Sequence, residues 1–427
     1  MDTEVCNNNL KANASNEFTQ SSNIDAFFQK LFINYLEKLP QGRIHLFNYD
    51  GKEYTLGSSD GTDAVHMHVH HPQFFRRVLL NGGIGMGEAF VDGWWNTSDL
   101  TPLLQIFARN LNWLNRFENR FSWITRPYYW LQHWSNRNHH KQSKKNIGAH
   151  YDLGNTLYRH FLDDSMLYSS GLYLSDSDTL EQSQANKVAK ILSELDLKDG
   201  DTLLEVGTGW GHLAIAAAKH CDCRVTTTTI SEEQYQYVQD RIAKENLGDR
   251  ITLLKKDYRD LPTHAQSAGH PSGYDKIVSI EMIEAVGKQY MDNYFKTLNT
   301  LLKPGGTLVL QSITMVDQRL NSYLKKPDFI QAHIFPGGFL PSINLLADHI
   351  TKDTQMVIRN ISDFGHSYAK TLDDWHRRML ANQSSLNDNG YDERFIRLWR
   401  FYFSYCEAGF LEKTISVIHL TATKSSN

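Results

Sequence analysis

The chain of 427 residues lacks any run of about 18 consecutive apolar residues, the length that a membrane-spanning helix needs. It has only four cysteines, and these do not have the spacing of a disulfide framework or of a zinc site. The polar segment 1–22 lacks both the basic and the apolar regions of a signal peptide. These absences argue against a membrane-spanning or disulfide-stabilised secreted protein, and they predict a protein of the reducing cytoplasm.

Excess charge of one sign is also missing, since the formal net charge is only −4, which argues against nucleic acid as a partner. Segment 101–147 departs from this balance, with eight Lys or Arg residues and one acidic residue. Apolar residues recur there at helical spacing with four tryptophans between them. Such a basic amphipathic helix suits the headgroup zone of a membrane. The alternative is that its apolar stripe packs on a neighbouring domain.

The glycine-rich stretch Leu-Leu-Glu-Val-Gly-Thr-Gly-Trp-Gly at 203–211 is the most informative feature that is present. An apolar strand runs there into a tight turn and then into a helix over 212–219, whose first amides can face a ligand. A dinucleotide-binding fold has an acidic residue about 20 residues later, at the end of the next strand. Here that strand ends in the polar segment 229–234 instead, and Glu205 is available for a ribose or an amino-acid group.

Strand and helix patterns alternate after this turn, as in a doubly wound α/β sheet. The later strands are expected at 224–229, 251–255, 274–280 and 306–311, with an antiparallel closing strand at 414–423. This order is typical of a methyltransferase sheet, with S-adenosylmethionine over the end of the first strand.

Eight motifs then occur in one order over about residues 40–424. They are GMGEAFVDGWW (85–95), HYDLGN (150–155), LYSSG (167–171), TISEEQ (229–234), DYRDL (257–261), EMIE (281–284), IFPGGFLPS (334–342) and SYAKTL (367–372). In this set the chain resembles the cyclopropane fatty acid synthase family, which includes the mycolic acid cyclopropane synthases. The resemblance implies a Rossmann-like class I methyltransferase sheet, mostly parallel with an antiparallel last strand, and a small N-terminal α+β domain.

The resemblance also implies methyl transfer from S-adenosylmethionine to the double bond of an unsaturated acyl chain, through a carbocation that bound bicarbonate deprotonates. The implied anion ligands are Glu284, the amide of Ile313, Tyr368, and Ser170 and Gln311, which stand where many relatives have cysteine and histidine. Serine and glutamine can each donate a hydrogen bond to a carbonate oxygen. Without that base, a methylene or methyl-branched product is expected, and a binding protein that has lost the chemistry is the alternative of another class.

Donor-binding residues are implied in the same way, although Tyr168 can equally be a core aromatic and Thr229 merely a strand former. The implied contacts are Tyr168, Ser169, Glu205, Gly207, Gly209, Gly211, Thr229, Ser231, Gln234, Asp257 and Tyr258. The expected partners are an unsaturated phospholipid at the inner membrane surface, where the enzyme attaches peripherally, and a second copy in a homodimer.

The predicted organisation is a disordered tail (1–25), a small N-terminal domain (26–100), the basic helical linker (101–147) and the catalytic domain (148–427). In the small domain we expect a helix over 26–39 and strands at 43–48, 53–56 and 65–71. The last strand places His66, His68 and His70 on one face, which suggests a metal site, although core packing by the alternate residues explains the pattern better. Glycines 83–87 follow a helical segment and predict a turn.

A long insertion over 314–348 follows the fifth strand, where such sheets build acceptor pockets. Its apolar residues can wall a channel for an acyl chain or form the core of a local lid: Met315, Phe329, Ile330, Ile334, Phe335 and Phe339.

Overall fold

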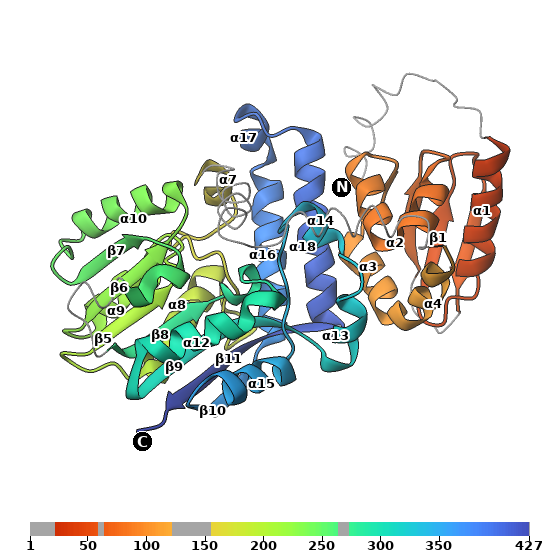
Figure 1. Cartoon of the computed structure of the whole chain (residues 1–427). Coiled ribbons are helices and arrows are strands. Elements are labelled where there is room, and N and C mark those ends of the chain that lie inside the picture. Colours follow the sequence, from red (N-terminus) through yellow and green to blue (C-terminus); the bar gives the residue numbers. More distant parts are fainter. Residues whose placement is uncertain (1–21, 59–63, 122–154, 264–272, 427) are drawn as a thin grey trace.

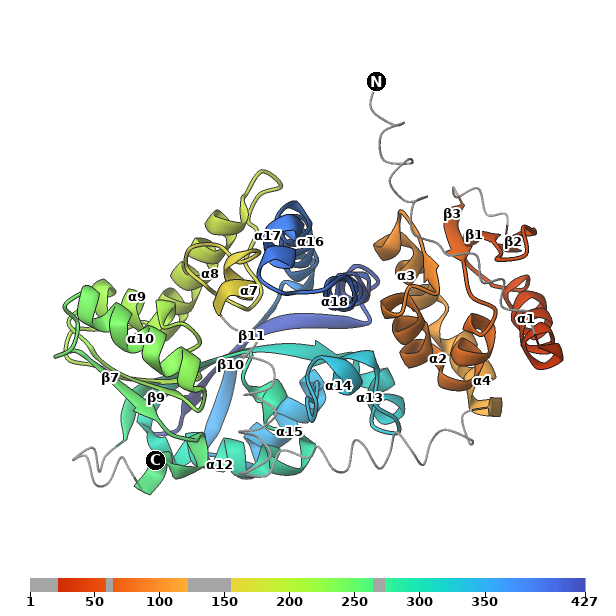
Figure 2. The same ribbon diagram turned by 90° about the horizontal axis from the view of Figure 1, so that it is seen from above.

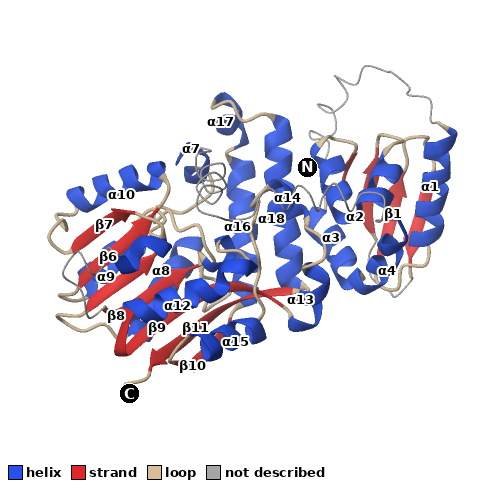
Figure 3. Cartoon of the chain, viewed as in Figure 1, coloured by secondary structure: helices blue, strands red, loops and turns tan. Residues whose placement is uncertain are grey.

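The computed structural model describes residues 22–58, 64–121, 155–263 and 273–426, which form two sheets and the helices around them (Figures 1 and 3). The larger sheet has the order β10-β11-β9-β8-β5-β6-β7. Its strands are β5 (Thr202–Val206), β6 (Arg224–Thr229), β7 (Ile251–Lys255), β8 (Tyr274–Ile280), β9 (Leu302–Met315), β10 (Met356–Asp363) and β11 (Ile415–Lys424). Strands β5 to β9 pair in parallel, whereas β11 runs antiparallel to both β9 and β10. The predicted sheet and its antiparallel closing strand are confirmed.

Helices cover both faces of this sheet because successive strand residues point to opposite sides. Leu203 packs in one apolar cluster with α8 (Leu180–Leu195), α9 (His212–His220) and α10 (Glu232–Lys244). Its neighbour Leu204 packs in a second cluster with α12 (Met291–Leu301) and α15 (Ile343–Asp353). Both faces of β5 are therefore buried, which explains why its sequence is nearly continuously apolar.

The N-terminal sheet has the order β2-β1-β3-β4. Its elements are α1 (Asn23–Leu36), β1 (Arg43–Phe47), β2 (Glu53–Gly57), β3 (Val65–Val69), α2 (Phe74–Val91) and β4 (Trp95–Asn96). Helix α1 begins three residues before the predicted start, because the Ser22 hydroxyl accepts a hydrogen bond from the amide of Asp25 (3.1 Å). Residues 23–25, predicted as part of the tail, therefore belong to the helix, and the rest of that tail, 1–21, lies outside the described residues.

The predicted turn at glycines 83–87 is wrong, because these residues lie inside α2. The chain kinks just before them at Gly82, which has φ 58° and ψ −136°. The glycines serve close packing further along the helix: a Cβ on Gly87 would lie 2.4 Å from the ring of Phe329 and 2.7 Å from that of Phe401. The absence of a side chain at Gly87 thus lets α2 approach the helices that carry Phe329 and Phe401.

The histidine face of β3 packs against aromatic side chains of β1. The rings of Phe47 and His68 stack with centroids 4.6 Å apart, and Phe47 meets His66 edge to face. No group of three His, Cys, Asp or Glu residues that could hold a metal ion occurs in the described ranges. Nor does any helix of those ranges have the length and apolarity to cross a membrane.

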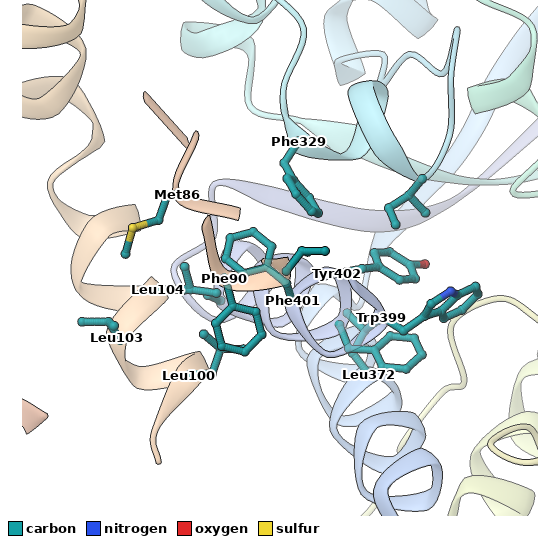
Figure 4. Close-up of a cluster of buried hydrophobic side chains, with 14 of the residues drawn as sticks. Met86, Phe90, Leu100, Leu103, Leu104, Phe329, Leu372, Trp399, Phe401 and Tyr402 are labelled. Carbon is teal, nitrogen blue, oxygen red and sulfur yellow. The ribbon is translucent and has the colours of Figure 1, made fainter. Parts of the chain in front are cut away.

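Helix α18 (Glu393–Leu411) joins the two sheets, since it packs on α16 (Gly365–Ala381) and also on α2 and α3 (Leu100–Arg109) (Figure 2). Figure 4 shows Leu104 of α3 and Phe90 of α2 beside Phe401 of α18. The Arg397 guanidinium of α18 also donates to the carbonyl of Phe90 (2.5 Å). Within the predicted linker, the apolar side of α3 thus packs on the neighbouring helix α18. Residues 122–147 of the linker lie outside the described residues.

The remaining described elements are short or lie at the edges of the fold. They are α4 (Leu111–Phe121), α7 (Asn155–Arg159), α13 (Asp317–Tyr323), α14 (Phe329–His333), α17 (Gln383–Asp388) and the 3₁₀ turns Tyr258–Asp260, Ile283–Ala285 and Lys288–Tyr290.

Leu103→Ala is expected to lower the free energy of unfolding by about 2–5 kcal/mol, because it leaves a cavity at a fully buried position of α3. Urea unfolding followed by tryptophan fluorescence measures the change. The control is Leu174→Ala, where the side chain is 73% exposed and the expected change is within about 0.5 kcal/mol. Equal stability of the two variants would contradict the packing role of α3.

Candidate functional site

A cavity of about 1220 Å³ lies at the carboxyl ends of β5, β6, β7 and β8. Gly207, Thr229, Asp257 and Glu281 each follow or end one of these strands and line it. In an open α/β sheet this edge is where ligands bind, because the loops after the strands meet there. The cavity continues between the catalytic domain and the N-terminal helices, where its wall is apolar.

The glycine turn after β5 needs its glycines for conformation and for space. Gly207, Gly209 and Gly211 have φ angles of 97°, 51° and 82°, which residues other than glycine rarely adopt. A Cβ on Gly211 would also lie 2.9 Å from the side chain of Val238. Gly211 is the residue before α9, so the turn holds the start of that helix at the rim of the cavity.

Most of the predicted donor-binding residues border this cavity. The ones that line it are Tyr168, Ser169, Glu205, Gly207, Gly209, Thr229, Gln234, Asp257 and Tyr258. Gly211 and Ser231 do not line it and act instead at helix starts, where the Ser231 hydroxyl accepts from the amide of Gln234 (3.3 Å). Asp257 already holds the guanidinium of Arg259, with Nε 2.8 Å and Nη2 2.6 Å from its carboxylate oxygens.

Tyr168 and Ser169 are tied to groups that the sequence analysis did not select. The hydroxyls of Tyr168 and Tyr402 lie 3.0 Å apart. The Lys187 ammonium donates to the Ser169 hydroxyl (2.6 Å), and this lysine is almost fully buried. Burial lowers the pKa of Lys187 to about 8. Lys187 lies in the middle of α8, where nothing in the sequence distinguishes it from a solvated helix position.

Glu205 is a buried residue of β5, close to the glycine turn that follows this strand. Its carboxylate accepts a hydrogen bond from the Thr227 hydroxyl of β6 (2.5 Å). Burial raises the pKa of Glu205 to about 8, against the opposing effect of this hydrogen bond. A cationic ligand group at this position would favour the ionised carboxylate.

Glu284 and Ile313 lie together as the resemblance implies, but they bond each other directly. The Ile313 amide donates to Oε1 of Glu284 (2.6 Å), and the Ser312 hydroxyl donates to the same oxygen (3.2 Å). The other oxygen, Oε2, is buried without a hydrogen-bond partner in the described part of the chain. Burial, reinforced by the neighbouring charge of Glu281, raises the pKa of Glu284 to about 8.

Glu281 is the residue that connects the other three predicted anion ligands. Its Oε1 accepts from the Ser170 amide (3.0 Å) and from the Gln311 side-chain amide (2.7 Å). Its Oε2 accepts from the Tyr368 hydroxyl (2.7 Å). The Ser170 hydroxyl does not take part, since it donates to the carbonyl of Gly171 (2.8 Å). In the sequence Glu281 is the first residue of the motif EMIE, and no pattern there indicates a role for it.

These contacts test whether the predicted residues fit a bound bicarbonate. Ser170, Gln311 and Tyr368 already direct a donor at Glu281, and the amide of Ile313 already serves Glu284. A second anion among them would have to displace a buried carboxylate and would lie next to its charge. The arrangement therefore does not fit bicarbonate.

A second layer of hydrogen bonds orients Gln311. Its carbonyl oxygen lies 2.9 Å from Nε2 of His419 on β11, and Nδ1 of that histidine lies 2.8 Å from Oε2 of Glu194. Because Gln311 turns its amide nitrogen towards Glu281, its oxygen faces His419, whose Nε2 must donate. Residues 194, 311 and 419 are far apart in sequence, so no local pattern indicated this chain of contacts.

The far part of the cavity is apolar. Five of the six residues selected in the insertion line it: Met315, Phe329, Ile330, Phe335 and Phe339. Ile334 does not line it and is buried in the adjoining core. The N-terminal domain adds the opposite wall with Phe32, Leu79 and Leu104. The insertion thus contributes both to a channel and to a local core.

The strand order and the cavity at the strand ends define a methyltransferase-type α/β fold. The structure of coclaurine N-methyltransferase superposes with a TM-score of 0.59 over 79% of this chain and 99% of that one; at 18% identity this shows the fold alone. The profile of the mycolic acid cyclopropane synthetase family matches residues 138–420, and the chain belongs to this family.

Individual relatives extend beyond the matched segment. The chain is 35% identical over 365 residues to the cyclopropane-fatty-acyl-phospholipid synthase of Escherichia coli K12, covering 84% of this chain and 87% of that protein. It is 33% identical over 390 residues to the tuberculostearic acid methyltransferase UfaA1 of Mycobacterium tuberculosis, covering 86% of each. The structure of the mycolic acid cyclopropane synthase CmaA1 with SAH and CTAB matches at 28% identity and a TM-score of 0.59, over 67% of this chain and 99% of that one.

Glu205→Gln is expected to flatten the pH dependence of stability between pH 5 and 8. The folded protein holds the Glu205 proton more tightly than the unfolded chain, so this contribution is complete below about pH 4.5 and is lost as pH rises towards 8. One such group contributes a slope of about 1.4 kcal/mol per pH unit. Urea unfolding at four pH values measures it.

The matched control is Glu245→Gln, at an exposed carboxylate paired with Lys219. This pairing lowers the pKa of Glu245, so its titration falls below the tested range and the slope is expected to stay that of the unsubstituted protein. A slope in Glu205→Gln equal to that of the control would contradict the buried, protonated state of Glu205.

Proposed function

We propose that this protein transfers a methyl group from S-adenosylmethionine to the double bond of an unsaturated fatty acyl chain of a membrane phospholipid, and that the product is a cyclopropane ring. One observation carries the proposal: a single cavity joins the glycine turn after β5 to an apolar channel, with the carboxylates of Glu281 and Glu284 among its lining residues. Few ligands other than a polar nucleoside and a long apolar chain would fill both parts.

The donor site has the chemistry that S-adenosylmethionine requires. The Gly207–Gly211 turn admits the ligand to the backbone, and Glu205 offers a carboxylate to a cationic amino group. Tyr258 offers a ring to the flat adenine. When bound, S-adenosylmethionine supplies the electrophilic methyl carbon, and the structure of the mycolic acid cyclopropane synthase CmaA1, which contains SAH, supports this assignment.

The acyl chain fits the part of the cavity between the insertion and the N-terminal helices. Phe329, Phe335 and Leu104 line this part. Basic side chains of Arg319, Lys325 and Lys326 also border the cavity and suit a phosphate headgroup. The proposal includes peripheral attachment to the inner surface of the cytoplasmic membrane, and a homodimer.

Our proposal assigns no step to bicarbonate, since the residues expected to hold it bond carboxylates of the chain. A methylene or methyl-branched acyl chain is the second candidate product. It is favoured by the similarity to the tuberculostearic acid methyltransferase, which is close to that for the phospholipid synthase.

The test is incubation of the full chain with methyl-labelled S-adenosylmethionine and vesicles of dioleoyl phosphatidylethanolamine, followed by gas chromatography of the fatty methyl esters. Labelled cyclopropane ester is the expected product, and vesicles with only saturated chains serve as the control. A labelled branched ester would select the second candidate. Donor binding without any labelled ester would contradict both and favour the binding protein.

Glu284→Gln is expected to lower turnover by about 100-fold, because it replaces a carboxyl group that is coupled electrostatically to the neighbouring Glu281 in the wall of the cavity. The amide keeps the hydrogen bond from the Ile313 amide but removes the ionisable oxygen that lies buried in the cavity wall. Binding of S-adenosylhomocysteine, measured by calorimetry, should stay within threefold of the unsubstituted protein. Glu245→Gln is the surface control, and full activity of Glu284→Gln would contradict the placement of the reacting centre.

A further inference from the structure

We propose that Glu281 is the built-in base of this reaction: its carboxylate, held where the resemblance implies a bound bicarbonate, takes the proton that the cationic intermediate loses. The inference rests on the proposed function and deepens it, because it makes turnover independent of added bicarbonate. It assigns a catalytic role to a residue for which the sequence motifs suggested none.

The first argument is the identity of the partners of Glu281. The three groups that direct a hydrogen bond at its carboxylate are the Ser170 amide, the Gln311 amide group and the Tyr368 hydroxyl. They come from three separate places in the fold, namely the segment before α8, strand β9 and helix α16. These are three of the five positions predicted to bind the anion, so a planar carboxylate of the chain takes the hydrogen bonds that a planar carbonate would need.

The second argument is position relative to the cavity. Glu281 and Tyr368 line the cavity, whereas Ser170 and Gln311 do not. Both of the latter are fully buried. Glu281 therefore stands between the cavity and the two donors behind it, and a substrate in the cavity meets the carboxylate rather than those donors.

The third argument is the backbone of Glu281 itself. Its φ of 48° is in the left-handed region, which costs a residue with a side chain roughly 1–2 kcal/mol relative to the right-handed region. The Glu281 amide donates to the carbonyl of Gln311 (2.9 Å), so main chain and side chain both bond the same residue of β9. Glycine suits such a position better, and glutamate there indicates a use for its carboxylate.

The electrostatics allow this carboxylate to be ionised beside a neutral neighbour. Burial raises the pKa of Glu281, but the Ser170, Tyr368 and Gln311 hydrogen bonds and the charge of Lys187 oppose that rise. Glu284, with fewer donors and next to Glu281, has its pKa raised to about 8 and keeps its proton at neutral pH. Because donors reach both of its oxygens, Glu281 is the member of the pair that is better suited to hold a negative charge.

The proposed step balances without another reactant. The π electrons of the alkene form a bond to the methyl carbon of the donor, the carbon–sulfur pair leaves with the sulfur, and the second alkene carbon becomes cationic. A C–H bond of the new methyl group then breaks, its electron pair closes the ring, and the proton goes to the Glu281 carboxylate. If the proton comes from the chain carbon that carries the new methyl group, the same base yields a methyl-branched alkene. Glu281 returns its proton to water as product leaves.

The test compares turnover on dioleoyl phosphatidylethanolamine vesicles in two buffers, both sparged free of carbon dioxide. One buffer then receives about 10 mM bicarbonate, far above any carryover, and the other receives none. Turnover of the unsubstituted protein is expected to agree within twofold in the two buffers. Glu281→Gln, which is nearly isosteric, is expected to lose about 100-fold in both. Glu281→Gly, which suits the left-handed backbone and vacates the anion position, is expected to regain at least tenfold on adding bicarbonate.

A binding measurement accompanies these rates. Line broadening of ¹³C-bicarbonate in NMR spectra is expected with Glu281→Gly and not with the unsubstituted protein, and S-adenosylhomocysteine calorimetry verifies that each variant is folded. The matched surface control is Glu245→Gln.

Loss of turnover by the unsubstituted protein in bicarbonate-free buffer, with recovery on addition, would overturn the inference while leaving the proposed function intact. Near-normal turnover of Glu281→Gln would overturn it as well. If the unsubstituted protein forms no methylated product in either buffer, the proposed function fails. The NMR arm then still decides whether Glu281 occupies the anion position, and specific bicarbonate binding to the unsubstituted protein would overturn that assignment.

Discussion

The hydrogen bonds that converge on Glu281 are the constraint around which the catalytic domain is arranged. They join the segment before α8, the middle of β9 and the first turns of α16, at residues 170, 311 and 368 of the chain. A buried carboxylate is tolerated only when its oxygens are satisfied, so each of these elements has to reach its place before the site is stable. The chain Glu194–His419–Gln311 extends the same constraint to β11.

Two neighbouring glutamates of one short segment thus have different properties because their surroundings differ. Glu281 receives donors on both oxygens, whereas Glu284 receives them on one oxygen and leaves the other unpartnered in the described structure. Hydrogen-bond donors on both oxygens favour the charged form of a carboxylate, whereas burial with fewer donors favours the protonated form. Neither property follows from residue type.

Local patterns in the sequence predicted most of the sheet. The ranges of β6, β7 and β8 coincide with the predicted strands, because each is a short segment of apolar and β-branched residues that is bounded by clear turns. Strand β10 escaped notice, since only Met356 of its eight residues is buried and its sequence has no apolar period. The glycines of α2 were wrongly predicted to form a turn: Gly87 allows a close approach to Phe329 and Phe401, which lie more than 200 residues away in the chain.

In the candidate site, too, some residues could be predicted from local motifs and others could not. Several residues that stand in contiguous motifs line the cavity, namely Gly207, Gly209, Asp257 and Tyr258. Glu281 was missed because its function depends on a left-handed backbone angle and on partners brought together by the fold. The resemblance identified those partners but assigned them to an external anion, and only the geometry replaces that anion with a side chain.

The apolar channel depends on the packing between domains. Leu79 and Leu104 of the N-terminal helices line the same cavity as Phe335 and Phe339 of the insertion, so neither domain alone encloses an acyl chain. Helix α18 holds the two walls together: Phe401 contacts the N-terminal side, and Tyr402 reaches towards Tyr168 at the donor end. A change in how α3 packs on α18 would therefore alter the width of the channel and, in the proposed reaction, the position of the double bond relative to Glu281. In the proposed function, substrate selection thus depends on the interface between the domains as well as on the part that holds the glycine turn.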